Sequence, residues 1–260
     1  MRSERPKFYF SFWSPYSWVA TRLLEESWEA ARLDIEYIPY WPPDEESLAL
    51  LRALGGDFLY VRMSREKHLY ILQDIKRITT GLGFRLGWPV DDRPWLDLPH
   101  LAYLAACRLG KGREFFWAVH RARWEEGRNV CSQETIRELA EGVGLPPEPV
   151  ASAPGDASVR REGAEALLRA HRDQVFGVPF FVKGYERFWG VDRLGTFFAA
   201  LEGRPYPYLA GASLTIPPQG DGLSRGLGAT AGSAQGAATI PEDALRAVGG
   251  YDKDCAGGCG

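Results

Sequence analysis

The first element that the hydrophobic pattern predicts is a strand near the N-terminus. Apolar and polar side chains alternate over Phe8–Phe12, which is the period-two pattern of a β-strand. From Ser17 onward the apolar positions fall at helical spacing, and a second strand is expected over Asp34–Tyr40, before two prolines break the chain. A strand, a helix and a strand within about 35 residues predict a βαβ unit with two parallel strands.

A long helical block follows this unit. From Asp44 to Arg172 nearly every segment has helical spacing, and turns rich in glycine and proline separate the segments. The predicted helices are Ser47–Leu54, Arg65–Thr80, Leu98–Leu109, Arg113–Glu126, Ser132–Val143 and Val159–Ala170.

Strand character returns after the helical block, at Val178–Val182 and around Arg187-Phe188. A closing helix is expected over Asp192–Leu201, with Asp192 as its N-cap. A βαβ unit, a helical block and a ββα unit are the order in which a thioredoxin-like α/β fold accepts a large, all-helical insertion. We therefore expect a discontinuous thioredoxin-like domain over 1–43 and 174–202, and an inserted helical domain over 44–173.

The composition changes after Glu202. The segment 203–260 holds 13 of the 29 glycines and has no sustained apolar periodicity, which predicts a flexible tail. Its end resembles the double-glycine leader of ribosomally made peptides, with Gly249-Gly250 ahead of two cysteines; a disordered extension is the alternative. Cys255 and Cys259 are too few ligands for a zinc site, so we expect no metal.

Charge and hydropathy narrow the class of protein. The formal net charge of −3, from 31 basic and 34 acidic residues, argues against nucleic acid or an anionic membrane as a partner. No window has the ~18 to 20 consecutive apolar residues of a membrane span, and the N-terminus lacks the pattern of a secretory signal. We expect a soluble, cytoplasmic protein with reduced cysteines, of which Cys107 reads as a small buried residue.

The strongest local feature is a hydroxyl at the predicted strand-to-helix turn. Ser14 lies in the run Phe10 to Trp18, where first-turn N–H groups and the helix dipole stabilise an anion. An ordinary alternative is that Ser14 caps the helix and Pro15 takes its first position.

A second feature points the same way. The sequence Phe-Gly-Val-Pro at 176–179 places a proline at the start of a strand, and Phe-Trp-Gly-Val-Asp-Arg-Leu follows at 188–194. Together with Phe-Ser-Phe-Trp-Ser-Pro-Tyr-Ser at 10–17, these motifs resemble the 2-hydroxychromene-2-carboxylate isomerase group. That group is related to kappa-class glutathione transferases and to the DsbA-like oxidoreductases, and the resemblance extends over residues 7 to about 201 in order and spacing.

The resemblance implies a role for several residues. Ser14 would replace the redox cysteine and hydrogen-bond the thiol of glutathione or another small thiol. Pro179 would be cis, so that Val178 presents its backbone to the thiol compound, and Asp192 would complete this subsite. We expect an aromatic substrate pocket that includes Trp13, Tyr16, Ser17, His100 and Trp189.

The activity implied is a cis–trans isomerisation. Ser14 and Ser17 stand at the two positions of a Cys-x-x-Cys motif, so disulfide exchange is excluded there. A bound thiolate could instead add reversibly to an aromatic or polyene-like unsaturated carbonyl compound, with a homodimer left open. Two departures weaken glutathione recognition: Val191 stands where many relatives have a polar residue, and the stretch 93–100 lacks asparagine.

Two other functions stay open at this stage. A glutathione transferase-like enzyme would use the same thiolate but release the adduct. A non-catalytic DsbA-like module would bind peptides at the cis-proline edge. His100 could act as a general acid or base, although a single histidine is more often structural.

Overall fold

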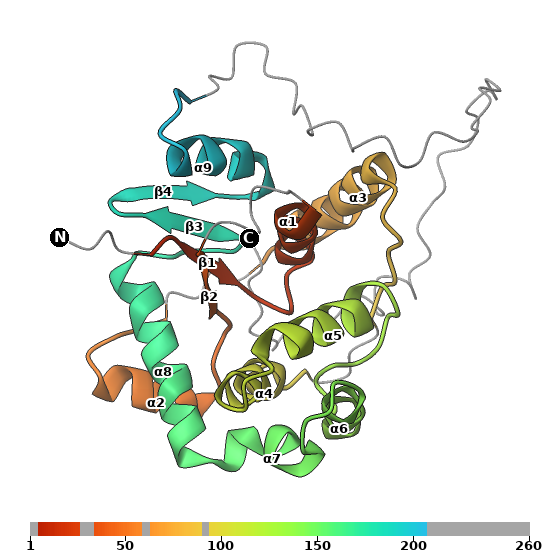
Figure 1. Ribbon diagram of the computed structural model, residues 1–260, viewed down its shortest axis with the longest axis vertical. Coiled ribbons are helices and arrows are strands. Elements are labelled where there is room, and N and C mark those ends of the chain that lie inside the picture. Colours follow the sequence, from red (N-terminus) through yellow and green to blue (C-terminus); the bar gives the residue numbers. More distant parts are fainter. Residues whose placement is uncertain (1–4, 27–33, 59–62, 90–93, 207–260) are drawn as a thin grey trace.

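The molecule is built on a four-stranded mixed sheet. The computed structural model describes residues 5–26, 34–58, 63–89 and 94–206. In these ranges the strands run in the order β2-β1-β3-β4 (Figure 1), and their bounds are β1 (Lys7–Phe10), β2 (Glu36–Pro39), β3 (Phe180–Lys183) and β4 (Glu186–Trp189). β1 and β2 are parallel, whereas β1–β3 and β3–β4 are antiparallel.

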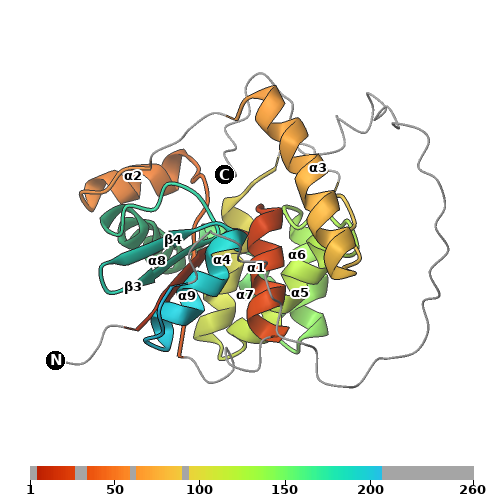
Figure 2. The ribbon, with the colours of Figure 1, turned by 90° about the horizontal axis from the view of Figure 1, so that it is seen from above.

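The helical insertion joins β2 to β3. Figures 1 and 2 show the sheet with α1 and α9 beside it, and Figure 1 shows α4 to α7 gathered together away from α9. The helices are α1 (Pro15–Glu26), α2 (Glu45–Ala53), α3 (Arg65–Leu82), α4 (Asp97–Arg108), α5 (Gly112–Trp124), α6 (Gln133–Gly142), α7 (Pro147–Ala151), α8 (Ala157–Arg172) and α9 (Leu194–Leu201), with 3-10 turns η2 (Ala153–Gly155) and η3 (Val191–Arg193). The predicted thioredoxin-like fold with a helical insertion is confirmed, while the exact domain limits stay a prediction.

The sheet is covered on both faces. On one face Lys7 Nζ and Tyr9 Oη donate to Asp173 Oδ2, just after α8, at 3.0 and 2.6 Å. On the other face Phe8 stacks on Phe181, and Phe181 stacks on Phe197 of α9, with the ring centroids 4.9 Å apart in both pairs. All four residues of β1 are buried for this reason, and the strand is not half-exposed.

Among the predicted element ends that differ in the structure, two lie near Ser14 and Asp192. β1 ends at Phe10 rather than Phe12, because side chains from other elements take over the backbone hydrogen bonds of the next two residues. Asp192 does not cap the closing helix: it lies in η3, and Arg193 occupies the cap position without a side-chain hydrogen bond.

Two sets of contacts fix the insertion. Trp18 and Val19 of α1 form a buried cluster with Ile71 and Ile75 of α3. The second set of contacts is a polar network around Arg160 of α8. Arg160 is only 4% exposed and holds the starts of α2 and α4. Its guanidinium lies 2.7 Å from Asp44 and donates to Ser47 Oγ at 2.8 Å, and it is 3.7 Å from Asp97.

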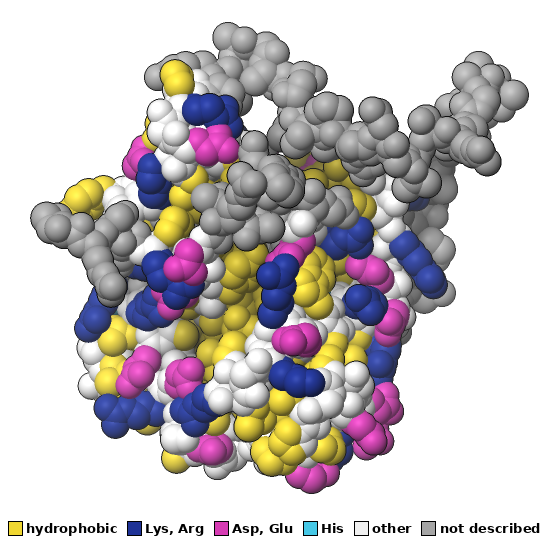
Figure 3. Space-filling model, in the orientation of Figure 1, with side chains coloured by type: hydrophobic (Ala, Val, Ile, Leu, Met, Phe, Trp, Pro, Cys, Tyr) yellow, Lys and Arg dark blue, Asp and Glu magenta, His cyan; other side chains and the backbone are white. Residues whose placement is uncertain are grey.

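Charge is dispersed over the surface. On the face in Figure 3, Lys and Arg are interspersed with Asp and Glu rather than separated by sign. None of the described helices is long and apolar enough to span a bilayer. The tail at 207–260, including the leader-like segment, lies outside the described residues.

Candidate active site

Ser14 caps α1 and lies four residues after the end of β1. Its Oγ accepts a hydrogen bond from Ser17 N at 3.2 Å, and Pro15 takes the first helical position. The helix N-cap and the candidate site residue are therefore both Ser14. The positive end of the helix dipole lies at its hydroxyl. The first turn of α1 has no acidic side chain that would cancel this positive potential.

A cis proline that is distant from Ser14 in the sequence lies close to this hydroxyl in the fold. The Val178–Pro179 peptide bond is cis, and Ser14 Oγ donates to Val178 O at 3.4 Å. This hydrogen bond is long and hence weak. The Ser14 hydroxyl can therefore turn its proton toward a negatively charged acceptor at little cost, and the structure brings together the three residues that the motifs singled out.

The insertion holds the turn before Ser14. His100 Nε2 of α4 accepts a hydrogen bond from Phe12 N at 3.1 Å, and Trp124 Nε1 of α5 donates to Phe12 O at 3.0 Å. Both backbone polar groups of Phe12 are thus bound by side chains of the inserted helices. The position of Ser14 depends on α4 and α5 as well as on the sheet.

His100 positions the turn before Ser14 from inside the fold, and its place in a substrate pocket stays a prediction. Its side chain is fully buried, and Nδ1 lies 2.6 Å from Leu96 O, which can only accept a proton. The neutral ring therefore carries its hydrogen on Nδ1 and accepts at Nε2. Burial lowers the pKa of His100 to about 3, so it is not a proton donor at neutral pH.

The two aromatic residues beside Ser14 are more exposed than the serines. Ser14 and Ser17 are both fully buried, whereas Trp13 and Tyr16 are half-buried. Tyr16 Oη donates to Asp74 Oδ2 of α3 at 2.8 Å, and burial together with this carboxylate raises the pKa of Tyr16. A ligand approaching Ser14 would meet Trp13 and a neutral Tyr16 first.

Asp192 and Trp189 lie on neighbouring elements. Asp192 is exposed in η3, which packs near α1, and Arg193 Nη1 donates to its carboxylate at 2.6 Å. A Cβ on Gly190 would lie 2.6 Å from Asp192 Oδ1, and φ there is +98°, so a glycine is required beside this carboxylate. The Trp189 ring packs against the Phe176 ring, with the centroids 5.0 Å apart. The place of Trp189 in a substrate pocket stays a prediction.

Arg123 is a residue that the sequence pattern did not single out. It is only 2% exposed, and its guanidinium carbon lies 3.9 Å from the centre of the Trp13 ring. An arginine on an amphipathic helix is expected to face solvent, and nothing in the neighbouring sequence distinguishes Arg123 from Arg121. Its burial follows from tertiary packing alone.

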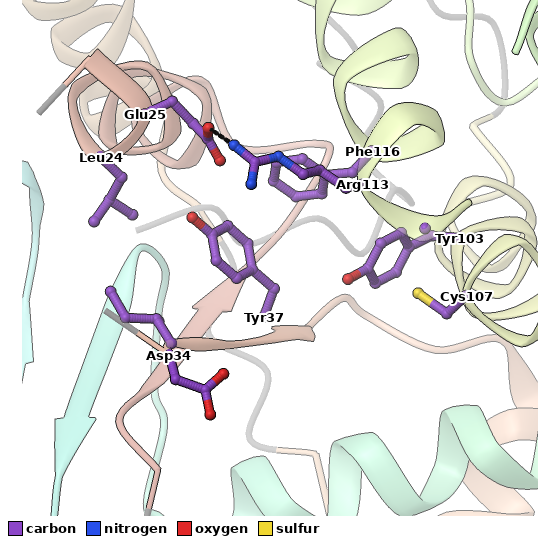
Figure 4. A pocket seen from close by; sticks show the side chains of 10 residues that line it. Leu24, Glu25, Asp34, Tyr37, Tyr103, Cys107, Arg113 and Phe116 are labelled. Carbon is purple, nitrogen blue, oxygen red and sulfur yellow. Dashed lines mark hydrogen bonds and ion pairs between the residues drawn. The ribbon is translucent and has the colours of Figure 1, made fainter. Parts of the chain in front are cut away.

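A separate cavity of about 310 Å³ lies at the β2 side of the sheet (Figure 4). Tyr37, Tyr103 and Phe116 form its aromatic walls, and Arg113 pairs with Glu25 at its rim. Cys107, expected to be buried, is exposed and lines this cavity with its thiol. None of the residues that line this cavity belongs to the Ser14 turn or the cis-proline segment.

The residues at Ser14 fit a thiol better than a metal. The described ranges contain no group of three or more His, Cys, Asp or Glu side chains placed to hold a metal ion. A hydroxyl donor, a helix N-terminus and a cis-proline backbone are instead the groups that would hold a small thiol as its thiolate.

Comparison with known proteins gives the family of the chain. Residues 7–202 match the profile of the DSBA-like thioredoxin domain. The chain belongs to this family. Within the DSBA-like family it is similar to the 2-hydroxychromene-2-carboxylate isomerase of Sphingobium xenophagum, with 27% identity over 192 residues, 72% of this chain and 92% of the relative.

Solved structures of the family show the same fold. A structure of 2-hydroxychromene-2-carboxylate isomerase has 22% identity and a TM-score of 0.63, covering 77% of this chain and 95% of its own. The cytosolic disulfide reductase DsbM from Pseudomonas aeruginosa, solved with GSH, has 20% identity and a TM-score of 0.51, covering 77% of this chain and 100% of its own. The DSBA-like relatives thus include both isomerases and disulfide oxidoreductases.

Proposed function

We propose that this protein is a thiol-assisted cis–trans isomerase of an aromatic or polyene-like unsaturated carbonyl compound. The observation that carries the proposal is the Ser14 hydroxyl between the start of α1 and the Val178 carbonyl, with serine at both positions of a redox motif. Serine cannot exchange disulfides, so a DSBA-like site of this kind is suited to binding a thiol.

Glutathione or another small thiol would supply the nucleophile. A bound thiolate would add to the conjugated carbon, with the electron pair moving onto the carbonyl oxygen, and would then be eliminated. The former double bond would be single for long enough to rotate, and no net oxidation would occur. The chain's own contribution is at Ser14, whose O–H can turn from Val178 O toward the sulfur, and at the start of α1, whose dipole lowers the thiol pKa. Val178 and Asp192 are the proposed contacts to the remainder of the thiol compound.

The relatives support this assignment at a coarser level. An isomerase is similar to the chain over most of its length, and a cytosolic family member was solved with GSH. We propose a cytoplasmic site of action on the same basis, since small thiols are abundant and reduced there.

Replacement of Ser14 tests the proposal. In Ser14→Ala we expect saturable glutathione binding, measured by calorimetry, to weaken at least about tenfold, and turnover of a conjugated carbonyl substrate to fall by roughly 100-fold. Ser158→Ala, an exposed hydroxyl on α8, is the matched control and leaves both unchanged. Equal thiol binding and turnover in the two variants would exclude the proposed role of Ser14.

The mass of the product separates the two enzymatic alternatives. An isomerase returns a product of the same mass and leaves the thiol concentration constant. A conjugating transferase consumes the thiol and yields the adduct.

A further inference from the structure

The cavity on the β2 side of the sheet has the size and the walls of a small-molecule site. Its volume of about 310 Å³ is roughly twice that of a cavity that holds benzene, so it has room for one aromatic ring with a short substituent. The Tyr37 and Phe116 rings stand edge to face with their centroids 5.4 Å apart, and the Tyr103 ring lies 5.8 Å from that of Phe116. A further ring can pack against such walls in the same offset or edge-to-face geometry.

One polar group in this cavity has no protein partner. The Tyr37 hydroxyl makes no hydrogen bond to any of the described residues, and burial raises the pKa of Tyr37, so the hydroxyl stays protonated. Figure 4 shows it directed across the cavity toward the ion pair of Glu25 and Arg113, whereas the Tyr103 hydroxyl lies beside the Cys107 thiol. A ligand with one hydroxyl or carbonyl group would therefore find a hydrogen-bond partner in Tyr37.

The charged side chains that line the cavity are compensated within the protein. Glu25 pairs with Arg113, and Asp34 pairs with Arg5. These three lining charges, Glu25, Asp34 and Arg113, thus each have a partner of opposite sign. An ion that entered the cavity would lose part of its hydration without gaining an unpaired counter-charge. The cavity therefore favours an uncharged ligand.

We infer that this cavity is a second ligand site, separate from the Ser14 site, for a small uncharged aromatic compound that carries a hydroxyl or carbonyl group. The inference does not depend on the proposed function, because none of the residues that line the cavity belongs to the Ser14 turn or to the cis-proline segment. The exposed Cys107 thiol in the lining is a convenient reporter of occupancy.

Binding of p-cresol to the full chain tests the inference. We expect saturable binding with a dissociation constant of about 1 mM or below, measured by calorimetry. The anion 4-hydroxybenzoate keeps the ring and the hydroxyl but has a carboxylate in place of the methyl group, and it should bind at least about tenfold more weakly. Weaker or non-saturable binding of p-cresol, or similar binding of the two compounds, would overturn the inference.

Alkylation of Cys107 shows where the compound binds. Iodoacetamide should modify Cys107 at least about fivefold more slowly when p-cresol is saturating, as measured by mass spectrometry of the peptide that contains it. The reaction is run at pH 8.5, because burial raises the pKa of the Cys107 thiol and the thiolate is the reactive form. Cys131, which does not line the cavity, is the internal reference and should react at an unchanged rate. Equal rates at Cys107 with and without p-cresol, or an unreactive Cys107 in the free protein, would contradict an open site there.

Two variants and a control complete the test. Tyr37→Phe removes the hydroxyl but keeps the ring, and it should weaken p-cresol binding about fivefold. Tyr185→Phe is the matched control, because this tyrosine is 97% exposed and lies outside the cavity. Its affinity for p-cresol should equal that of the wild type.

Ser14→Ala should also bind p-cresol as the wild type does, whether or not it loses turnover. Loss of p-cresol binding in Ser14→Ala would place the compound at the Ser14 site and overturn the inference, and so would an unchanged affinity in Tyr37→Phe. The Cys107 measurement uses the wild type, so it decides the matter even where a variant fails to fold.

Discussion

Two buried histidines beside the Ser14 turn are held neutral. His100 has both ring nitrogens bonded, whereas neither nitrogen of His120 has a hydrogen-bond partner among the described residues. His120 packs among the rings of Phe10, Phe12 and Phe116 instead. Burial lowers the pKa of each histidine to about 3.

These depressed pKa values predict a loss of stability in acid. The unfolded chain binds these protons below about pH 6.5 and the folded chain does not until about pH 3, so the free energy of unfolding falls as the pH decreases through this window. Each histidine contributes a slope of at most ~1.4 kcal/mol per pH unit. His120→Phe should therefore remove about half of the histidine contribution and keep the aromatic packing.

Urea denaturation at pH 7 and pH 5 measures this difference. The loss between the two pH values should be smaller in His120→Phe than in the wild type, and no smaller in His171→Phe, where the histidine is exposed. Identical losses in the wild type and His120→Phe would contradict the assignment of a buried neutral ring.

The residue scale also shows where sequence reasoning stops. Ser14 and Pro179 could be predicted because their motifs are local. The role of His100 could not, since its partner Phe12 lies 88 positions away in the chain and only the packing of α4 brings the two together. Arg123 was missed for the same reason, because an arginine on a helix gives no sign of burial before its neighbours are placed.

At the scale of elements, the close approach of two helices requires a glycine where they meet. Gly163 lies on the buried side of α8, where an added Cβ would be 2.5 Å from Leu101 Cδ2 and 3.2 Å from the Trp41 ring. Both neighbours are themselves fully buried and cannot move into solvent. A glycine is needed here for packing and not for backbone conformation.

A pair of glycine substitutions separates packing from helix propensity. Gly163→Ala should destabilise the protein by about 1–2 kcal/mol, because overpacking outweighs the gain in helix propensity. Gly81→Ala in α3, where an added Cβ meets nothing within 4 Å, should stabilise it by up to ~1 kcal/mol. Midpoints of thermal unfolding measure both, and a stabilising Gly163→Ala would contradict the close approach of α8 to α4.

Most elements could be predicted because their periodicity is strong. The predicted helix Arg65–Thr80, for example, differs from α3 by two residues at its end. The short helix α7 was missed because its five residues include two prolines and are too few for a helical pattern. The start of α1 was placed two residues late, at Ser17, although Ser14 and Pro15 are the signals that begin it.

On the scale of the whole molecule, the sheet and its covering helices are complete by the end of α9. The family match ends at residue 202, and Leu201 closes the last described helix. The fold should therefore not require the glycine-rich segment that follows.

A chain that ends at Tyr206 tests this expectation. Its melting temperature should lie within about 3 °C of the full chain, a difference of less than ~1 kcal/mol for a domain of this size. A fall of more than roughly 10 °C, or failure to fold, would place part of the stability in the segment that follows.

The hydrogen bonds of Phe12 and Ser14 also bear on when the candidate site can form during synthesis. The turn leaves the ribosome early, but it is completed only after Trp124 and then Val178 have been added. A growing chain therefore carries the Ser-Pro-Tyr motif for most of its translation without the hydrogen bond between Ser14 and Val178. A chain that ends before Val178 would lack this arrangement, whereas a chain that extends through α9 contains every residue that forms it.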